Sequence, residues 1–242
     1  MKAIEYSSYI VSLLFIGIGV VYWIKHRIRP WKNMGFVIDN NTIQDILAGI
    51  AICGVSVSII FLIDNVFSLI KVKEIVSPTD IFYKFILFLF VASFIEEFIN
   101  RSLLVNGLLV LIKRKWLIIV LASIFFGLGH ATGEGVSAVS ILSNALGGAI
   151  YTTAFLGAKN LWFPWALHFS WNAFQYLYGY PVSGLIEDPI VLQEEVRDTI
   201  FTGGVYGPEG GLVGLIFRFV ILFALLFYLY KFRQVRIKEI FS

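Results

Sequence analysis

The chain has 242 residues, of which 58% are hydrophobic and 14% are charged, and its mean hydropathy is +0.83. Because soluble domains average about 25% charged residues, this composition excludes an ordinary soluble domain and indicates a polytopic integral membrane protein. The net charge of +3 comes from basic residues gathered in short loops, a pattern that reports membrane topology rather than nucleic-acid binding, so no nucleic-acid partner is expected.

Seven apolar segments are candidates for membrane spans, since a helical span needs roughly 20 apolar residues. They are 4–24, 43–63, 81–112, 116–130, 136–156, 161–178 and 212–230. The first lacks a small-x-small cleavage site and is followed by basic residues, which favours an uncleaved span. The sequence therefore predicts an all-α fold: a polytopic transmembrane helix bundle of about seven spans, six to eight being the range. Residues 1–242 are expected to form one integral membrane domain in the cell membrane.

The third segment, 81–112, is unusually long. At 1.5 Å per residue it would extend ~48 Å, well beyond a hydrocarbon core of ~30 Å. The segment is therefore expected either to be strongly tilted or to be broken, with Asn106-Gly107 as the candidate break. Both alternatives stay open at this point.

Basic residues mark the cytoplasmic ends of spans. The loops expected inside are 25–32, 113–115, 159 and the C-terminal segment, and those expected outside are 71–80, 131–135 and 180–210. This assignment alternates strictly and predicts the N-terminus outside and the C-terminus inside. The glycine-rich run 202–211, at the end of the long polar segment, can be a re-entrant cap over the site or only a linker, and the linker is slightly favoured.

Three charged residues lie inside the third apolar segment. Each costs at least ~2.5 kcal/mol at the centre of a bilayer, so partners are expected. Glu97 and Arg101 are four residues apart, share a helix face and can pair, which lowers the cost of burying both. Glu96 points about 100° away on the same helix and has no obvious local partner.

Further polar residues lie in the later apolar segments. His130 ends the fourth, and His168 and Asn172 share a face of the sixth. Each alone can serve only to join helices. Together with Glu96 they can supply a general base, metal ligands or electrophilic donors. The rise per residue would let them meet within the bilayer, nearer its cytoplasmic half, which predicts a catalytic or transport site.

The polar residues form three motifs in a fixed order. They are Glu96-Glu97 with Arg101, Phe126 with His130, and His168 with Asn172. In this the chain resembles the CAAX proteases and bacteriocin-processing enzymes (the CPBP family), also called type II CAAX prenyl endopeptidase-like or Abi proteins. The resemblance covers a catalytic core of about 81–175.

The resemblance implies intramembrane peptide hydrolysis. Glu96 would activate the water with His130 beside it, and His168 and Asn172 would stabilise the oxyanion or hold a metal. Glu97 and Arg101 would give structural support. Zinc bound by His130, His168 and either Glu96 or Asn172 would leave one position open for water. The same side chains also support a metal-free mechanism, so the metalloprotease question stays open.

The expected partner is a peptide or protein substrate, either free or membrane-anchored or lipidated. It would reach the site from the cytoplasmic side or laterally from the lipid. Two alternatives remain: a non-catalytic bacteriocin immunity-type membrane protein with the same fold, and an ion- or proton-coupled transporter. A transporter predicts internal repeats, and the sequence shows none.

Overall fold

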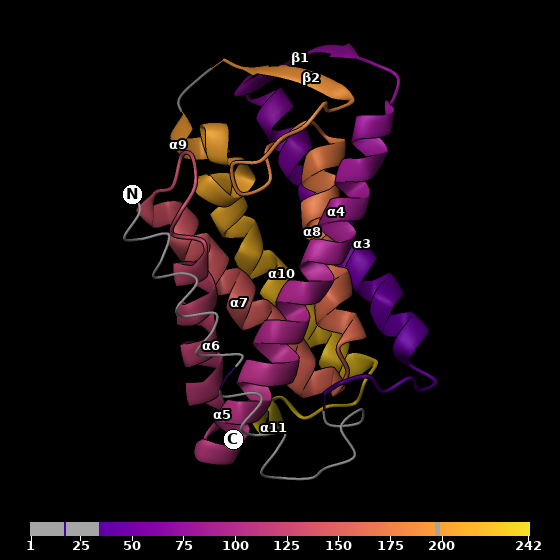
Figure 1. Ribbon diagram of the computed structural model, residues 1–242, viewed down its shortest axis with the longest axis vertical. Coiled ribbons are helices and arrows are strands. Elements are labelled where there is room, and N and C mark those ends of the chain that lie inside the picture. The colour runs from indigo at the N-terminus through magenta and orange to yellow at the C-terminus, as the bar shows by residue number, and fades with distance from the viewer. Residues whose placement is uncertain (1–16, 18–33, 197–198) are drawn as a thin grey trace.

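A computed structural model of the protein describes Gly17 and residues 34–196 and 199–242. The expected first span, 4–24, apart from Gly17, and the basic loop 25–32 lie outside the described residues, as does the N-terminus. The described part is mostly helical, and its long helices run roughly along one axis (Figure 1).

Every expected apolar segment from 43–63 onward is helical. The helices are α3 (Thr42–Val66), α4 (Asp80–Glu97), the π-helical stretch η1 (Phe98–Val105), α5 (Asn106–Leu111), α6 (Lys115–Gly129), α7 (Ala138–Ala158), α8 (Trp162–Leu177) and α10 (Leu212–Lys231). Within the described part, α3, α7 and α10 are long and apolar enough to cross a membrane. The helical membrane fold is thus supported, whereas the number of seven spans and the orientation of the termini stay predictions.

The expectation of a purely α-helical chain needs one correction. Strands β1 (Ile70–Ile75) and β2 (Val191–Glu195) form a small antiparallel sheet, in which Ile70 pairs with Glu195 and Ile75 with Val191. The sheet covers the end of the bundle at which α4 begins (Figure 1, top). It was missed because its strands are short and partly charged, which is typical of a loop between spans. The remaining short elements are α9 (Thr199–Thr202), the 3₁₀ turns Gly204–Tyr206 and Pro208–Gly210, and α11 (Ile237–Phe241).

The long third segment is one continuous helical run with a π-helical middle. Residues 80–97 are α-helical, 98–105 are π-helical, and 106–111 return to the α-helix. No break occurs at Asn106-Gly107, where the backbone keeps helical geometry. The irregular stretch is the π-helical η1, which directly precedes Asn106 and contains Arg101. π-Helical turns are frequent at functional sites because they re-aim side chains.

Small residues bring α6 and α7 into close contact. A Cβ atom on Gly127 would lie 2.8 Å from the carbonyl oxygen of Ile141, and one on Gly148 would lie 3.0 Å from Cα of Ser123. These distances leave no room for a side chain. The face of small residues that includes Ser123 and Gly127 therefore packs backbone against backbone, and this fixes the end of α6, where His130 follows.

A buried carboxylate joins the helices at the end of the bundle farthest from the sheet. Asp45 accepts hydrogen bonds from Asn160 Nδ2 at 2.7 Å and Tyr228 Oη at 2.9 Å, and Arg233 Nη1 lies 3.5 Å away. Asp45 is fully buried, so its charge needs these partners. The cluster ties the start of α3 to the α7–α8 connection and the end of α10.

Replacing Gly148 by alanine is expected to destabilise the protein, because the added methyl group must push α6 away from α7. Overpacking of this kind costs about 1–3 kcal/mol. Gly129→Ala is the matched control, since a Cβ there meets nothing within 4 Å. The thermal unfolding midpoint of each purified variant in detergent measures the effect. Equal midpoints for the two variants would contradict the close α6–α7 contact.

Candidate active site

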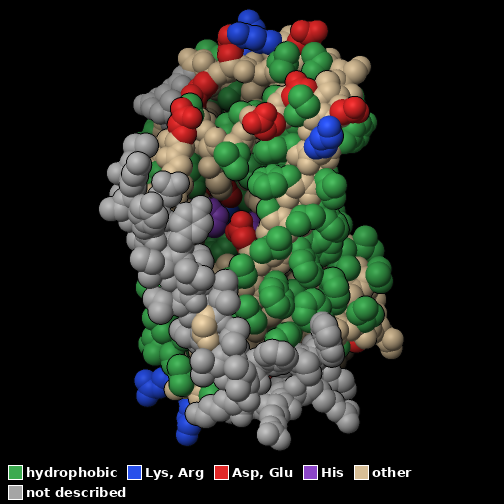
Figure 2. Space-filling model, viewed as in Figure 1, with side chains coloured by type: hydrophobic (Ala, Val, Ile, Leu, Met, Phe, Trp, Pro, Cys, Tyr) green, Lys and Arg blue, Asp and Glu red, His purple; other side chains and the backbone are tan. Residues whose placement is uncertain are grey.

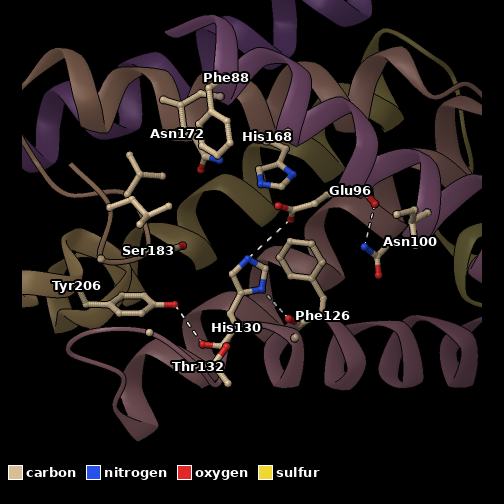
Figure 3. Close-up of a pocket in the computed structure, with 18 of the residues that line it drawn as sticks. Phe88, Glu96, Asn100, Phe126, His130, Thr132, His168, Asn172, Ser183 and Tyr206 are labelled. Atoms are coloured by element: carbon tan, nitrogen blue, oxygen red, sulfur yellow. Dashed lines mark hydrogen bonds and ion pairs between the residues drawn. The ribbon is translucent and has the colours of Figure 1, made fainter. Parts of the chain in front are cut away.

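The four residues expected to carry chemistry surround one cavity. Glu96 from α4, His130 from the end of α6, and His168 and Asn172 from α8 all line a space of about 610 Å³. Figure 3 shows their side chains turned toward this space. From outside, acidic and histidine side chains are visible within a hollow in the surface (Figure 2). Residues up to 76 positions apart in the sequence are thereby brought together.

Glu96 and His130 face each other across the cavity. Glu96 Oε2 lies 3.8 Å from His130 Nε2, and their side chains are 41% and 20% exposed. His130 Nδ1 lies 2.8 Å from the carbonyl oxygen of Phe126. Because a carbonyl only accepts, Nδ1 carries the hydrogen and neutral His130 has its free electron pair on Nε2. The 3.8 Å separation is too long for a direct hydrogen bond, but one water molecule can bond to both groups.

His168 is held by a buried carboxylate. Its Nδ1 lies 2.9 Å from Oε1 of Glu97, whose Oε2 lies 2.9 Å from Nε of Arg101. The Glu97 and Arg101 side chains are fully buried, and that of His168 is 5% exposed. The expected Glu97–Arg101 pair is present, but Glu97 has a second role that the sequence reading missed. It fixes the orientation of His168 and leaves Nε2 of that ring free for another partner.

Two aromatic rings pack between the charged groups and the histidines. The Arg101 guanidinium lies 5.0 Å from the ring centre of Phe126 and 5.6 Å from that of Tyr151, in cation–π range. Phe126 also contacts the His130 ring, and Tyr151 stacks on the His168 ring with centres 4.8 Å apart. The rings therefore restrict both histidines and cover the buried charge.

Two asparagines complete the polar lining. Asn172 lies one turn beyond His168 on α8, and its Nδ2 is 3.4 Å from Oγ of the buried Ser93. Asn100, which the sequence reading did not select, lines the cavity and donates to the backbone carbonyl of Glu96 at 2.8 Å. Asn172 thus places an amide beside the imidazole of His168, as their spacing of four residues predicts.

The segment between α8 and α10 forms part of the cavity wall. We call residues 179–196 and 199–211 the wall segment. Val182, Ser183, Gly184, Leu185 and Tyr206 from this segment line the cavity, and Figure 3 shows Ser183 and Tyr206 beside it. Tyr206 belongs to the run 202–211, so the interpretation of that run as only a linker is wrong.

A buried ion pair anchors the wall segment. Glu209 Oε1 accepts from Trp171 Nε1 at 2.7 Å and from Arg218 Nη2 at 3.0 Å, and its Oε2 accepts from Ser183 Oγ at 2.6 Å. Arg218 Nη1 also donates to Tyr151 Oη at 3.1 Å. This network joins the wall segment to α7, α8 and α10.

Tyr206 gives the wall segment a direct contact with His130. Its hydroxyl accepts from Asn144 Nδ2 at 3.1 Å and lies 3.4 Å from the backbone carbonyl of His130, to which it donates. Nothing in the sequence pattern marked Tyr206 or Ser183. Arg218 was detectable, since a guanidinium in the apolar segment 212–230 requires a buried partner.

The described residues do not form a ready metal site. No group of three His, Cys, Asp or Glu side chains within the described part of the chain is arranged to hold a metal ion. Glu96 and His130 face each other at 3.8 Å, and the contact of His168 Nδ1 with Glu97 leaves Nε2 as the nitrogen of that ring that could bind a metal. Zinc needs three protein ligands near 2.0–2.2 Å around one point. The described side chains are therefore not preformed as a zinc site, and zinc bound by His130, His168 and Glu96 or Asn172 stays a prediction.

Comparison with known proteins gives one family match. Residues 78–174 match the family model described as type II CAAX prenyl endopeptidase Rce1-like. The matched segment begins just before α4 and ends within α8, and it contains all six charged, histidine and asparagine residues of the three motifs. The family resemblance predicted from those motifs is confirmed. No curated protein and no solved structure matches the chain.

Arg218→Met is expected to destabilise the protein strongly, because it leaves the buried carboxylate of Glu209 without its cation. Losing one partner of a buried pair costs about 3–5 kcal/mol. The double variant Glu209→Gln with Arg218→Met should recover part of the loss. Thermal unfolding in detergent gives the comparison.

Arg236→Met is the control for this pair, since Arg236 lies in an exposed ion pair with Glu239 and exposed pairs contribute about 0–1 kcal/mol. Equal effects of Arg218→Met and Arg236→Met would contradict an anchoring role for the buried pair.

Proposed function

We propose that this protein, with its type II CAAX prenyl endopeptidase-like segment, is an intramembrane endopeptidase that hydrolyses a peptide bond with a water molecule activated by Glu96. The observation that carries the proposal is the convergence of Glu96, His130, His168 and Asn172 on one cavity. The Glu96 carboxylate there faces the free nitrogen of the His130 imidazole, and the amide of Asn172 lies on α8. Water activation and oxyanion stabilisation require these two kinds of group.

The first step is attack by water. A water molecule between Glu96 Oε2 and His130 Nε2 can donate a hydrogen bond to each. Glu96 takes one proton as the water oxygen bonds to the carbonyl carbon of the peptide. The hydrogen bond from His130 Nδ1 to the Phe126 carbonyl keeps the other ring nitrogen facing the water.

The second step stabilises the negative charge that forms on the carbonyl oxygen. Asn172 can donate to this oxygen through its amide, and His168 can donate through Nε2 when that nitrogen carries a proton. Glu97 and Arg101 do not touch the substrate in this scheme. They hold the His168 ring in place, so that little reorganisation is needed as charge develops.

The third step breaks the carbon–nitrogen bond. The proton held by Glu96 passes to the leaving amine nitrogen, which departs as a neutral amine, and the carbonyl forms again as a carboxylic acid. Glu96 returns to its ionised state. The cycle consumes one water molecule and needs no other reactant.

The substrate is proposed to be a peptide or a membrane-anchored protein. A cavity of about 610 Å³ is large enough for several side chains but not for a folded domain. The apolar helices around it suit a peptide attached to a lipid or to a membrane span. A prenylated CAAX peptide is of this kind.

Glu96→Gln is expected to lower the rate of cleavage by about 10²–10⁴, the usual contribution of a general base. Glu134→Gln is the matched control, since Glu134 also lines the cavity but lies exposed at its edge. Mass spectrometry of membrane proteins from cells that produce each variant detects the new peptide termini. Termini that appear with the control but not with Glu96→Gln identify substrates.

The same comparison separates the alternatives. A non-catalytic immunity-type protein or a transporter would give the same set of termini with wild type and Glu96→Gln. That outcome, with both variants shown to be folded by their unfolding midpoints, would refute the proposal.

Metal removal is expected to leave the cleavage rate unchanged, because the proposed steps use only protein side chains and water. The purified protein is treated with a strong chelator, its zinc content is measured, and cleavage of an identified substrate peptide is timed. Loss of activity that zinc restores would instead assign His130, His168 and Glu96 or Asn172 as ligands.

A further inference from the structure

Asn100 is a cavity residue that the proposed mechanism does not use. It lies in η1, one turn after Glu96 and directly before Arg101, and it belongs to none of the three motifs. Its side chain is partly buried and contributes to the cavity lining, as do its apolar neighbour Ile99 and Phe125 of α6. A polar group in such surroundings is expected to have a hydrogen-bonding role.

One half of the Asn100 amide is engaged and the other is not. Nδ2 donates to the backbone carbonyl oxygen of Glu96 at 2.8 Å, and Figure 3 shows this bond beside the cavity. Because a carbonyl only accepts, the group that faces it must be the amide nitrogen, which leaves Oδ1 on the other side. Oδ1 makes no hydrogen bond to any residue that the structure describes. Asn100 therefore offers an acceptor oxygen to a molecule in the cavity.

The bond to the carbonyl four residues earlier does not by itself explain an asparagine at this position. Asn106 and Asn144 make the same bond, to Ser102 and Ser140. Both of these asparagines are buried, and neither lines the cavity. Asn100 differs from them because its side chain reaches the cavity.

Asn100 and Asn172 are displaced in opposite directions from the centre of the site. Helices α4 and α8 are antiparallel, since aromatic contacts join the start of α4 to the end of α8 and the end of α4 to the start of α8. Asn100 follows Glu96 by one turn, and Asn172 follows His168 by one turn. Figure 3 accordingly shows the two amides on opposite sides of the Glu96 side chain.

A trans peptide group suits the space between these two amides. It is planar, and its C=O and N–H point in opposite directions. When the carbonyl oxygen of the scissile bond is turned toward Asn172 and His168, as the proposed mechanism requires, the N–H of the same bond points toward the side on which Asn100 lies. An N–H that is withdrawn from water into this lining needs an acceptor, and Oδ1 of Asn100 supplies one.

We propose that Asn100 is a substrate-binding residue whose Oδ1 accepts a hydrogen bond from the N–H of the scissile peptide bond. This inference rests on the proposed function and adds a contact on the amine side of the bond. It holds the leaving nitrogen on the side of Glu96, which must protonate that nitrogen. The site therefore binds the scissile amide at both ends and disfavours a bond without an N–H, such as the bond before a proline.

Replacing the scissile amide by an ester tests this contact, because an ester keeps the carbonyl group and can be hydrolysed but has no N–H. The probes are a short synthetic peptide that spans a Glu96-dependent cleavage site and the same peptide with the ester at that bond. The value of kcat/KM for each probe is measured with purified wild type, Asn100→Leu and Asn100→Asp in detergent. Hydrolysis by Glu96→Gln is subtracted as background.

Asn100→Leu is expected to lower kcat/KM for the amide by roughly 10-fold more than for the ester, because only the amide loses a hydrogen bond. Asn100→Asp keeps an acceptor oxygen and should keep the wild-type ratio of the two rates. A merely structural role, including loss of the bond to the Glu96 carbonyl, would lower both rates equally and overturn the inference.

Failure of this inference is distinct from failure of the proposed function. Glu96-dependent cleavage of both probes, with the same amide-to-ester ratio in wild type and Asn100→Leu, refutes the role of Asn100 alone. Absence of any Glu96-dependent cleavage by wild type refutes the peptidase activity and, with it, the substrate contact.

Discussion

The site depends on the buried carboxylate of Glu97. It lies between the Arg101 guanidinium and the His168 imidazole, with 2.9 Å contacts on both sides and no exposed surface. A lone carboxylate or guanidinium at this depth would be strongly unfavourable, and the pair is tolerated because each group compensates the other. The same carboxylate joins two helices, since Glu97 ends α4 and His168 lies in α8. One interaction therefore makes burial of charge possible and sets the orientation of a site residue.

A second buried ion pair, Glu209 with Arg218, packs against α8 through Trp171. Glu209 and Arg218 bind Ser183 of the wall segment on one side and Tyr151 on the other. Tyr151 stacks on the His168 ring, so the contacts run without interruption from the wall segment to Glu97. The wall and the polar floor of the cavity thus form one unit.

Sequence reasoning predicted the features of the site that follow from hydropathy and from the periodicity of a single helix. Apolar segments located α3 to α8 and α10, and the spacing of four residues gave both the Glu97–Arg101 pair and the shared face of His168 and Asn172. It failed where two distant segments meet. Hydropathy does not fix how one span is rotated against another, so the Glu97–His168 contact was invisible. The wall segment is irregular, with glycines at positive φ, and has no period to detect. The pairing of Arg218 with Glu209 could have been sought and was overlooked.

The order of the chain has a consequence for how the candidate site is assembled. The residues that surround the cavity from α4 to α8 are synthesised first, ending at Asn172, whereas the anchor of the wall segment needs Arg218 in α10. Until α10 is inserted, Glu209 lacks its cation, and the wall segment is joined to α7 and α8 only by contacts such as Asn144 with Tyr206 and Trp171 with Glu209. Insertion of α10 is therefore the step that completes the support of the wall segment around the candidate site.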